Sequence, residues 1–182
     1  MNWTISNKIT AMRIILVPVL VLTFYFPTPL SYYASGLVFA IAGWSDLLDG
    51  YLARKRGEVT AFGRFLDPIA DKLLVTVALV LLVDAGFAST VLVLILISRE
   101  IIIGGLREWL AERDVVVHVS QMGKWKTVSQ MFAIEGLLLH DGFFGLSLFE
   151  AGTFFLWLAT ILSIWSGYEY IKGALPELQK GD

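Results

Sequence analysis

Six long apolar stretches constrain this chain more than any other feature of its sequence. They cover residues 11–27, 31–55, 67–85, 88–112, 123–140 and 149–172, with glycine or proline between them. A helix needs about 20 mainly apolar residues to cross a bilayer. Of the 182 residues, 57% are hydrophobic and 16% are charged, whereas about a quarter are charged in a typical soluble domain. The sequence therefore predicts one all-α membrane domain over residues 1–182, with six transmembrane helices after a short N-terminal segment.

The distribution of lysine and arginine predicts the orientation of these helices. With both termini on one side, the loops near residues 28–31, 84–90 and 140–150 face the same compartment and contain no lysine or arginine. All 14 lysine and arginine residues then fall toward the opposite side. The positive-inside rule identifies that side as the cytoplasm. We expect a multi-pass protein with both termini and the polar helix ends in the cytoplasm.

Composition excludes several kinds of site. The chain has no cysteine, so a metal ion would be held by oxygen ligands or by histidine. His118 and His140 stand on loops predicted to lie on opposite sides, so we expect them to be solvated and not to share a metal. The net charge of -2 argues against a general nucleic-acid surface.

Two pairs of aspartates stand where apolar helix is expected. Asp46 and Asp49 are three residues apart near the end of the second stretch, and Asp67 and Asp71 are four apart at the start of the third. Each spacing places both acids of a pair on one helix face. Ionisable groups this close to hydrocarbon are costly unless they are paired or bound to metal. Two Mg²⁺ or Mn²⁺ ions, which prefer carboxylate oxygen, would satisfy four such acids.

The residues after the first acid pair suit a phosphorylated ligand. Gly50 and Ala53 carry minimal side chains, so a base or a diphosphate could approach the backbone closely. Arg54, one turn beyond the acids, could pair with a phosphate. Ordinary small-residue helix packing, and for Arg54 an extension toward lipid headgroups, are the alternatives.

These residues together form a known pattern. Asp46-x-x-Asp49-Gly50-x-x-Ala53-Arg54, followed by Gly63, Asp67 and Asp71, resembles the signature of the CDP-alcohol phosphatidyltransferase family at every fixed position. The resemblance extends over the whole chain. It implies six transmembrane helices and a short N-terminal helix along the membrane surface, and a homodimer is common in the family it resembles.

The resemblance also implies a role for each matched residue. Asp46 and Asp67 would bridge two metal ions, Asp49 would complete the first metal site, and Asp71 would complete the second and act as general base. The residues implied to contact CDP-diacylglycerol are Gly50, Ala53, Arg54, Thr60, Gly63, Asn7 and Thr10. For Thr60 and Asn7, a polar loop residue and a helix cap are the alternative readings.

Four cations are candidates for binding an acceptor phosphate. Arg99 and Arg107 are eight residues apart on nearly the same face of the fourth stretch, and Lys124 and Lys126 open the fifth. The sequence around them is similar to bacterial members of the family that make phosphatidylglycerophosphate. An ion pair between Arg99 and an acid such as Glu100 is an alternative, and basic residues are normal at cytoplasmic helix ends.

The function implied is transfer of the phosphatidyl group from CDP-diacylglycerol, taken from the membrane, to the 1-hydroxyl of sn-glycerol 3-phosphate. Another acceptor, such as an inositol phosphate, serine or phosphatidylglycerol, would use the same chemistry. A divalent-cation transporter would also need intramembrane acids, although transporters place them near the midplane between repeats. Glu135, within the fifth stretch, matches no pattern and is expected to pack or pair.

Overall fold

Six helices make up the described part of the chain, as the prediction of an all-α fold requires. They are α1 (Ile5–Phe24), α2 (Ser31–Arg56), α3 (Ala61–Asp84), α4 (Thr90–Ala111), α5 (Gln121–Leu138) and α6 (Phe149–Leu178). The computed structural model describes residues 5–27, 30–56, 61–113, 115, 117, 120–142 and 147–179. Within the helices, the side chains of residues 5, 6, 8, 46–56, 61–65, 67, 68 and 71 lie outside the described set.

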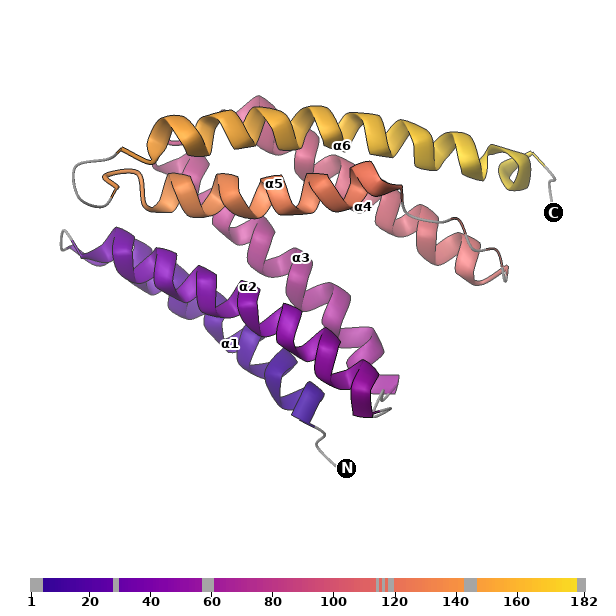
Figure 1. Ribbon diagram of the computed structural model, residues 1–182, viewed down its shortest axis with the longest axis horizontal. Helices are drawn as coiled ribbons and strands as arrows, with labels where there is room; N and C mark the ends of the chain where they lie inside the picture. The colour runs from indigo at the N-terminus through magenta and orange to yellow at the C-terminus, as the bar shows by residue number, and fades with distance from the viewer. Residues whose placement is uncertain are drawn as a thin grey trace.

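The helices form two antiparallel hairpins connected by a central pair (Figure 1). α1 and α2 make one hairpin, drawn in indigo and purple, and α5 and α6 make the other, in orange and yellow. α3 packs against α1, α2, α4 and α5, and α4 packs against α6. The central position of α3 places the residues at its start near several other helices.

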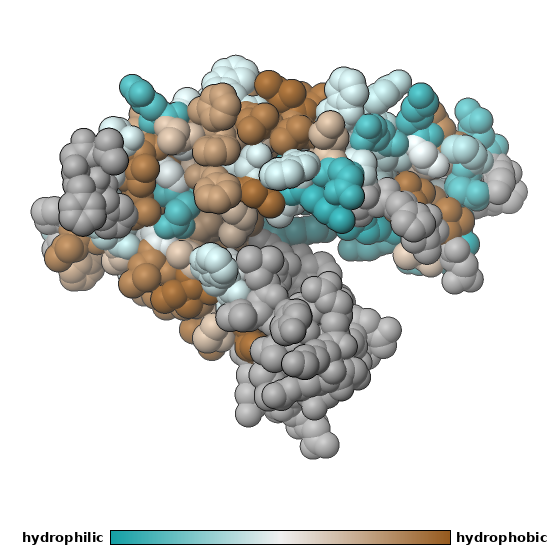
Figure 2. All heavy atoms as spheres, viewed as in Figure 1, coloured by the Kyte–Doolittle hydropathy of each residue, from teal (hydrophilic) through white to brown (hydrophobic). Residues whose placement is uncertain are grey.

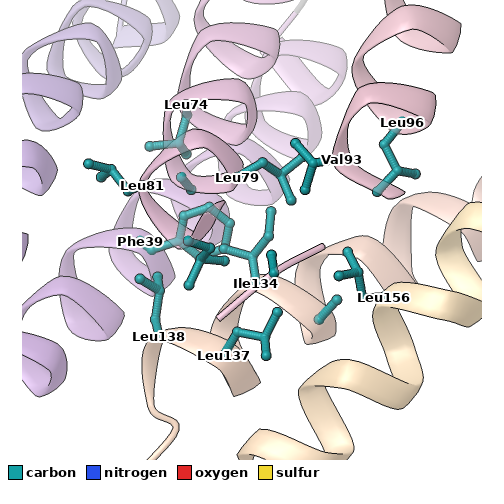
Figure 3. Close-up of a cluster of buried hydrophobic side chains, with 14 of the residues drawn as sticks. Phe39, Leu74, Leu79, Leu81, Val93, Leu96, Ile134, Leu137, Leu138 and Leu156 are labelled. Atoms are coloured by element: carbon teal, nitrogen blue, oxygen red, sulfur yellow. The ribbon is translucent and has the colours of Figure 1, made fainter. Parts of the chain in front are cut away.

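The core lies where α3 meets α2, α4 and α5. Its buried side chains include Phe39 of α2, Leu79 and Leu82 of α3, Leu96 of α4 and Ile134 of α5. Figure 3 shows how side chains from these helices converge, together with Leu156 of α6. Close-packed interiors of this kind leave little room for a change of side-chain volume, so the helix positions are closely constrained.

The first helix differs from the prediction of a separate N-terminal surface helix. α1 runs without interruption from Ile5 to Phe24 and so includes both the expected surface segment and the first apolar stretch. Nothing ends the helix early, because no glycine or proline stands between residues 5 and 17. Asn7, Thr10 and Arg13 are all buried, so this segment packs against the protein.

The α5–α6 hairpin depends on two facing glycines. A Cβ atom built on Gly136 would lie 2.9 Å from the Cα of Gly152, and one built on Gly152 would lie 2.7 Å from the backbone nitrogen of Leu137. Backbones can approach this closely only where side chains are absent. The two helices therefore pair through their main chains at this point.

The three loops without basic residues lie at one end of the structure. The hydroxyl of Tyr25, after α1, donates to the Asp84 carboxylate at the end of α3 over 2.6 Å. The His140 ring, after α5, lies 4.4 Å from the Tyr32 ring and 4.2 Å from the Phe87 ring, measured between centroids. His140 is therefore packed among aromatic rings, and the expectation that it is solvated was wrong; His118 lies outside the described residues.

By length and composition, one described helix is a candidate membrane span. Among the described residues, α6 is the helix that is long and apolar enough to cross a bilayer, and the apolar part of α1, Ile9–Phe24, is shorter. α4 is apolar but also contains Arg99, Glu100 and Arg107. Figure 2 shows hydrophobic surface over much of this face, with hydrophilic atoms gathered toward the end where α4 finishes and α5 begins.

Replacing Gly152 with alanine should loosen the α5–α6 hairpin. Because the new methyl group would press on backbone atoms that cannot move separately, we expect a loss of about 1–3 kcal/mol in stability, as for other overpacked sites. Thermal unfolding of the purified protein in detergent, followed by tryptophan fluorescence, measures the change. Gly105→Ala is the matched control, since no atom of the described residues lies within 4 Å of its Cβ position. A midpoint for Gly152→Ala at or above that of the wild type would contradict this prediction.

The bond between Tyr25 and Asp84 predicts a pH dependence. Donation to the Asp84 carboxylate raises the pKa of the Tyr25 hydroxyl above its ordinary value of 10.0. A group with a raised folded pKa contributes stability below its unfolded pKa, and this contribution is lost as the pH rises through the folded value. In the wild-type protein, the Tyr25 contribution to phenolate absorbance, identified by its loss in Tyr25→Phe, should appear above pH 10. In Asp84→Ala, the same contribution should appear at a lower pH. An unchanged titration in Asp84→Ala would exclude the bond.

Candidate functional site

The backbone places the two aspartate pairs on consecutive helix ends. α2 is helical through Arg56 and α3 begins at Ala61, so Asp46 and Asp49 lie in the last turns of α2. Asp67 and Asp71 lie in the first turns of α3, and the two helices are in contact. The helical prediction for both pairs is thus confirmed, and each pair shares a helix face.

The side-chain geometry of this signature lies outside the described residues. This applies to the four aspartates and to Gly50, Ala53, Arg54 and Gly63, while Thr60 is outside the described chain altogether. Among the side chains that the structure describes, no three acids or histidines are grouped to hold a metal ion. The donor set still fits a hard cation, because two adjacent helix ends carry carboxylates at helical spacing and the chain has no thiol.

α1 turns a polar face toward the protein beside these helices. Asn7 and Thr10, both predicted to contact CDP-diacylglycerol, are buried at 7% and 0% exposure. Arg13 continues the same face three residues later and is exposed by only 1%. α1 packs against both α2 and α3. Sequence reasoning missed Arg13, although its position inside an apolar stretch, three residues after Thr10, was a usable signal.

A buried ionic cluster links α4, α5 and α6. The ammonium of Lys126 and the Nη1 atom of Arg99 both pair with the same oxygen of Glu100, the Arg99 contact being 3.4 Å long. Nη2 of Arg99 donates to the hydroxyl of Ser166 in α6 over 3.0 Å. The Lys126 residue is 3% exposed. The alternative reading of Arg99, an ion pair with Glu100, is therefore confirmed, and the pair includes Lys126 as well.

Lys72 brings α3 into this cluster. It follows Asp71 directly in α3, and its side chain crosses onto α4, where its ammonium occupies the space in which a Cβ of Gly104 would stand. Gly104 stands one helical turn after Glu100 in α4, so the Lys72 ammonium meets the same face of α4 that carries Glu100. Lys72, Glu100, Gly104 and Ser166 were not predicted as site residues. Of these four residues, only Glu100 could be linked to Arg99 from the sequence, because the two are adjacent.

The structure separates the four cations that were predicted to bind an acceptor. Arg99 and Lys126 meet at Glu100, whereas Arg107 and Lys124 are exposed. The guanidinium carbon of Arg107 lies 5.7 Å from the centre of the Tyr170 ring, which suits a cation–π contact. Among the described ion pairs, neither Arg107 nor Lys124 contacts Glu100.

Glu135 has a packing contact with the first hairpin. Its carboxylate oxygen lies 3.2 Å from where a Cβ of Gly36 in α2 would stand. The side chain is half-buried. This placement fits the expectation that Glu135 packs between helices.

Comparison with known proteins identifies close relatives over almost the full length. Residues 3–165 match the sequence profile of the CDP-alcohol phosphatidyltransferase family. A CDP-diacylglycerol–glycerol-3-phosphate 3-phosphatidyltransferase of Haemophilus influenzae is 46% identical over 98% of this chain and 97% of its own length. Proteins of the same name are 40% identical in Escherichia coli, over 98% of both chains, and in Bacillus subtilis, over 93% and 94%.

Proposed function

This chain belongs to the CDP-alcohol phosphatidyltransferase family, and we propose that it transfers the phosphatidyl group of CDP-diacylglycerol to sn-glycerol 3-phosphate. The products are phosphatidylglycerophosphate and CMP, the former a precursor of phosphatidylglycerol and cardiolipin. The observation that carries this proposal is the agreement among relatives. Those at 40–46% identity, covering nearly the whole chain, are named for this one reaction.

All six helices are proposed to cross the bacterial cytoplasmic membrane. They have 18 to 30 residues, and at about 1.5 Å per residue even the shortest nearly matches the hydrocarbon thickness. Large apolar side chains also point outward along the helices, including Leu22, Val91, Ile101, Phe154 and Trp165, each more than half exposed. Such a surface suits lipid. The basic helix ends, the site and both termini then face the cytoplasm, and a homodimer stays a prediction from the family resemblance.

The aspartates of α2 and α3 would hold the divalent cations that this family uses. In our proposal there are two ions, Mg²⁺ or Mn²⁺, with Asp46 and Asp67 shared between them, Asp49 in the first site and Asp71 in the second. When bound, such ions neutralise charge on the diphosphate of the donor. The spacing of the acids on two adjacent helix ends supports this assignment.

The residues around the acids would orient CDP-diacylglycerol. Gly50, Ala53 and Gly63 leave room for the nucleotide and its diphosphate, and Arg54 offers a bidentate partner for phosphate. Thr60, Asn7 and Thr10 would add hydrogen bonds. Burial of Asn7 and Thr10 on the inner face of α1 supports their inclusion. The acyl chains stay in the bilayer, so the donor reaches the site sideways from the cytoplasmic leaflet.

Asp71 acts as the general base. Its carboxylate takes the proton from the 1-hydroxyl of glycerol 3-phosphate as that oxygen attacks the phosphorus that carries diacylglycerol. A bond forms between this oxygen and phosphorus, and the bond from phosphorus to the bridging oxygen of the diphosphate breaks. CMP leaves with the bridging oxygen. Asp71 directly precedes Lys72 in α3.

Arg99 and Lys126 are the cations best placed for the acceptor phosphate. They converge at Glu100, where Arg99 also donates to Ser166 of α6. Arg107 and Lys124 are exposed and would act at a distance, by attracting the anion. A serine acceptor would have no use for grouped cations, which favours a phosphate-bearing acceptor.

The product lipid tests the proposed reaction directly. Purified protein supplied with CDP-diacylglycerol, a divalent cation and one alcohol at a time should release CMP with glycerol 3-phosphate. An identical reaction with serine should give a rate at least about a hundredfold lower, because a site built to pair a charged phosphate rejects an analogue that leaves its cations unpaired. Inositol phosphate and phosphatidylglycerol, supplied in the same way, are the other candidate acceptors. Mass spectrometry of the lipid identifies the product. Faster turnover with another alcohol would reassign the acceptor, and no CMP with any of them would refute the family chemistry for this chain.

Replacing Asp71 with asparagine should abolish turnover. The amide keeps the size of the side chain but can neither accept the proton nor contribute charge to a cation site, and loss of both should lower kcat by at least about a thousandfold. Radiolabelled glycerol 3-phosphate incorporation measures the rate. Asp84→Asn is the matched control, because Asp84 ends the same helix at the opposite end, beside Tyr25. A normal rate for Asp71→Asn would remove this residue from the mechanism.

A further inference from the structure

The ionic cluster holds more positive charge than its own acid neutralises. Arg99 and Lys126 pair with the carboxylate of Glu100, and the Lys72 ammonium meets α4 at Gly104, one helical turn further along. Counted over these described side chains alone, two positive charges are left over. A phosphate monoester carries between one and a half and two negative charges near neutral pH. Charge complementarity of this kind selects a partner more strongly than it raises raw affinity.

Lys72 is the member of the cluster nearest to the reacting groups along the chain. It follows the proposed base directly in α3. Its ammonium is directed onto α4 because Gly104 has no side chain to occupy that space. Gly105 differs in this respect, since no described atom lies within 4 Å of its Cβ position. Of these two adjacent glycines, only Gly104 has a described side chain, that of Lys72, packed where a Cβ atom would stand.

We propose that Lys72 is a third acceptor-binding cation, which Gly104 admits to the site, and that Glu100 is the positioning residue that gathers Lys72, Arg99 and Lys126 into one dianion site. This inference rests on the proposed function and specifies how the acceptor is chosen. Glu100 does not touch the acceptor. It holds the cations at a separation that they would not keep alone, because like charges repel.

A purely structural salt bridge is the competing explanation. Buried ion pairs contribute little net stability compared with apolar packing of similar volume, since desolvation offsets their attraction. A structural pair also needs one cation for one acid, whereas here Lys126 and Arg99 both pair with Glu100 and Lys72 meets α4 one helical turn away, at Gly104. The surplus of cations over acids is the observation that favours an anion site.

The two adjacent glycines provide the decisive comparison. Gly104→Ala should fold, because the atom it meets is the far end of the flexible Lys72 side chain. The ammonium would be pushed away, and KM for glycerol 3-phosphate should rise about tenfold, the effect of one lost charge-assisted hydrogen bond. KM for CDP-diacylglycerol should stay within about twofold on the same reasoning. Gly105→Ala should leave both constants unchanged. Equal values for the two alanine variants would overturn the role of Lys72.

Replacing Glu100 with glutamine tests the positioning role. The amide keeps the shape but releases the cations, so KM for glycerol 3-phosphate should again rise at least about tenfold while KM for the donor is kept. Glu100→Asp should recover part of the loss, because it restores the charge. Should Glu100→Gln not fold, the Gly104→Ala comparison still decides the proposal. A normal or lowered KM for glycerol 3-phosphate in Glu100→Gln would overturn it.

Binding of a bare anion separates this inference from the proposed reaction. Inorganic phosphate, titrated calorimetrically into the detergent-solubilised wild-type protein, should bind about tenfold more tightly than to Gly104→Ala, by the same lost hydrogen bond. If the wild type makes phosphatidylglycerophosphate but binds phosphate no better than Gly104→Ala does, the inference fails and the function stands. If phosphate binds but no lipid is made, the proposed function fails and the anion site stands.

Discussion

The pairing of Glu100 with Lys126 and Arg99 is the interaction on which the arrangement of α4, α5 and α6 depends. A charge inside an apolar helix is tolerated when it finds a partner there. α4 has two adjacent charges of opposite sign, and α5 brings a third that is almost fully buried. Ser166 adds a hydrogen bond from α6. Removing any one of these partners would leave another charge or donor uncompensated, so the helices are held in register as a group.

Glycines are as important to this arrangement as the charged residues. Gly136 and Gly152 let α5 and α6 meet backbone to backbone, and Gly104 makes space for the Lys72 ammonium. The first pair fixes the hairpin that presents Lys126, and Gly104 fixes where the α3 cation reaches α4. Helix packing and cation placement are therefore parts of one arrangement, which joins the end of the signature on α3 to the second half of the chain.

The sequence predicted the helices well because apolar stretches and breakers are local signals. The bounds of α2, α4 and α5 lie within a few residues of the expected ones, and the spacing of the aspartates needed only helical geometry. The prediction of a separate N-terminal helix was wrong, because no glycine or proline between residues 5 and 17 interrupts α1. The prediction that His140 is solvated was wrong because Tyr32 of α2 and Phe87 of the α3–α4 connection pack against its ring. Two contacts could not be predicted from the sequence: the pairing of both Arg99 and Lys126 with Glu100, and the packing of Lys72 against Gly104. Both depend on how helices from different parts of the chain pack together.

In the proposed mechanism, recognition of the donor depends on a local sequence motif, whereas recognition of the acceptor depends on how several helices pack together. The predicted donor and metal residues lie mostly on two helix ends joined by a short connection, so a local motif can preserve them. The proposed acceptor cations come from α3, α4 and α5, and their grouping depends on how these helices pack against one another and against α6. A substitution that shifts one helix by part of a turn would leave the signature intact and still disperse the cations. In the proposed mechanism, acceptor choice therefore depends on tertiary packing, whereas the donor and metal site depends on the motif.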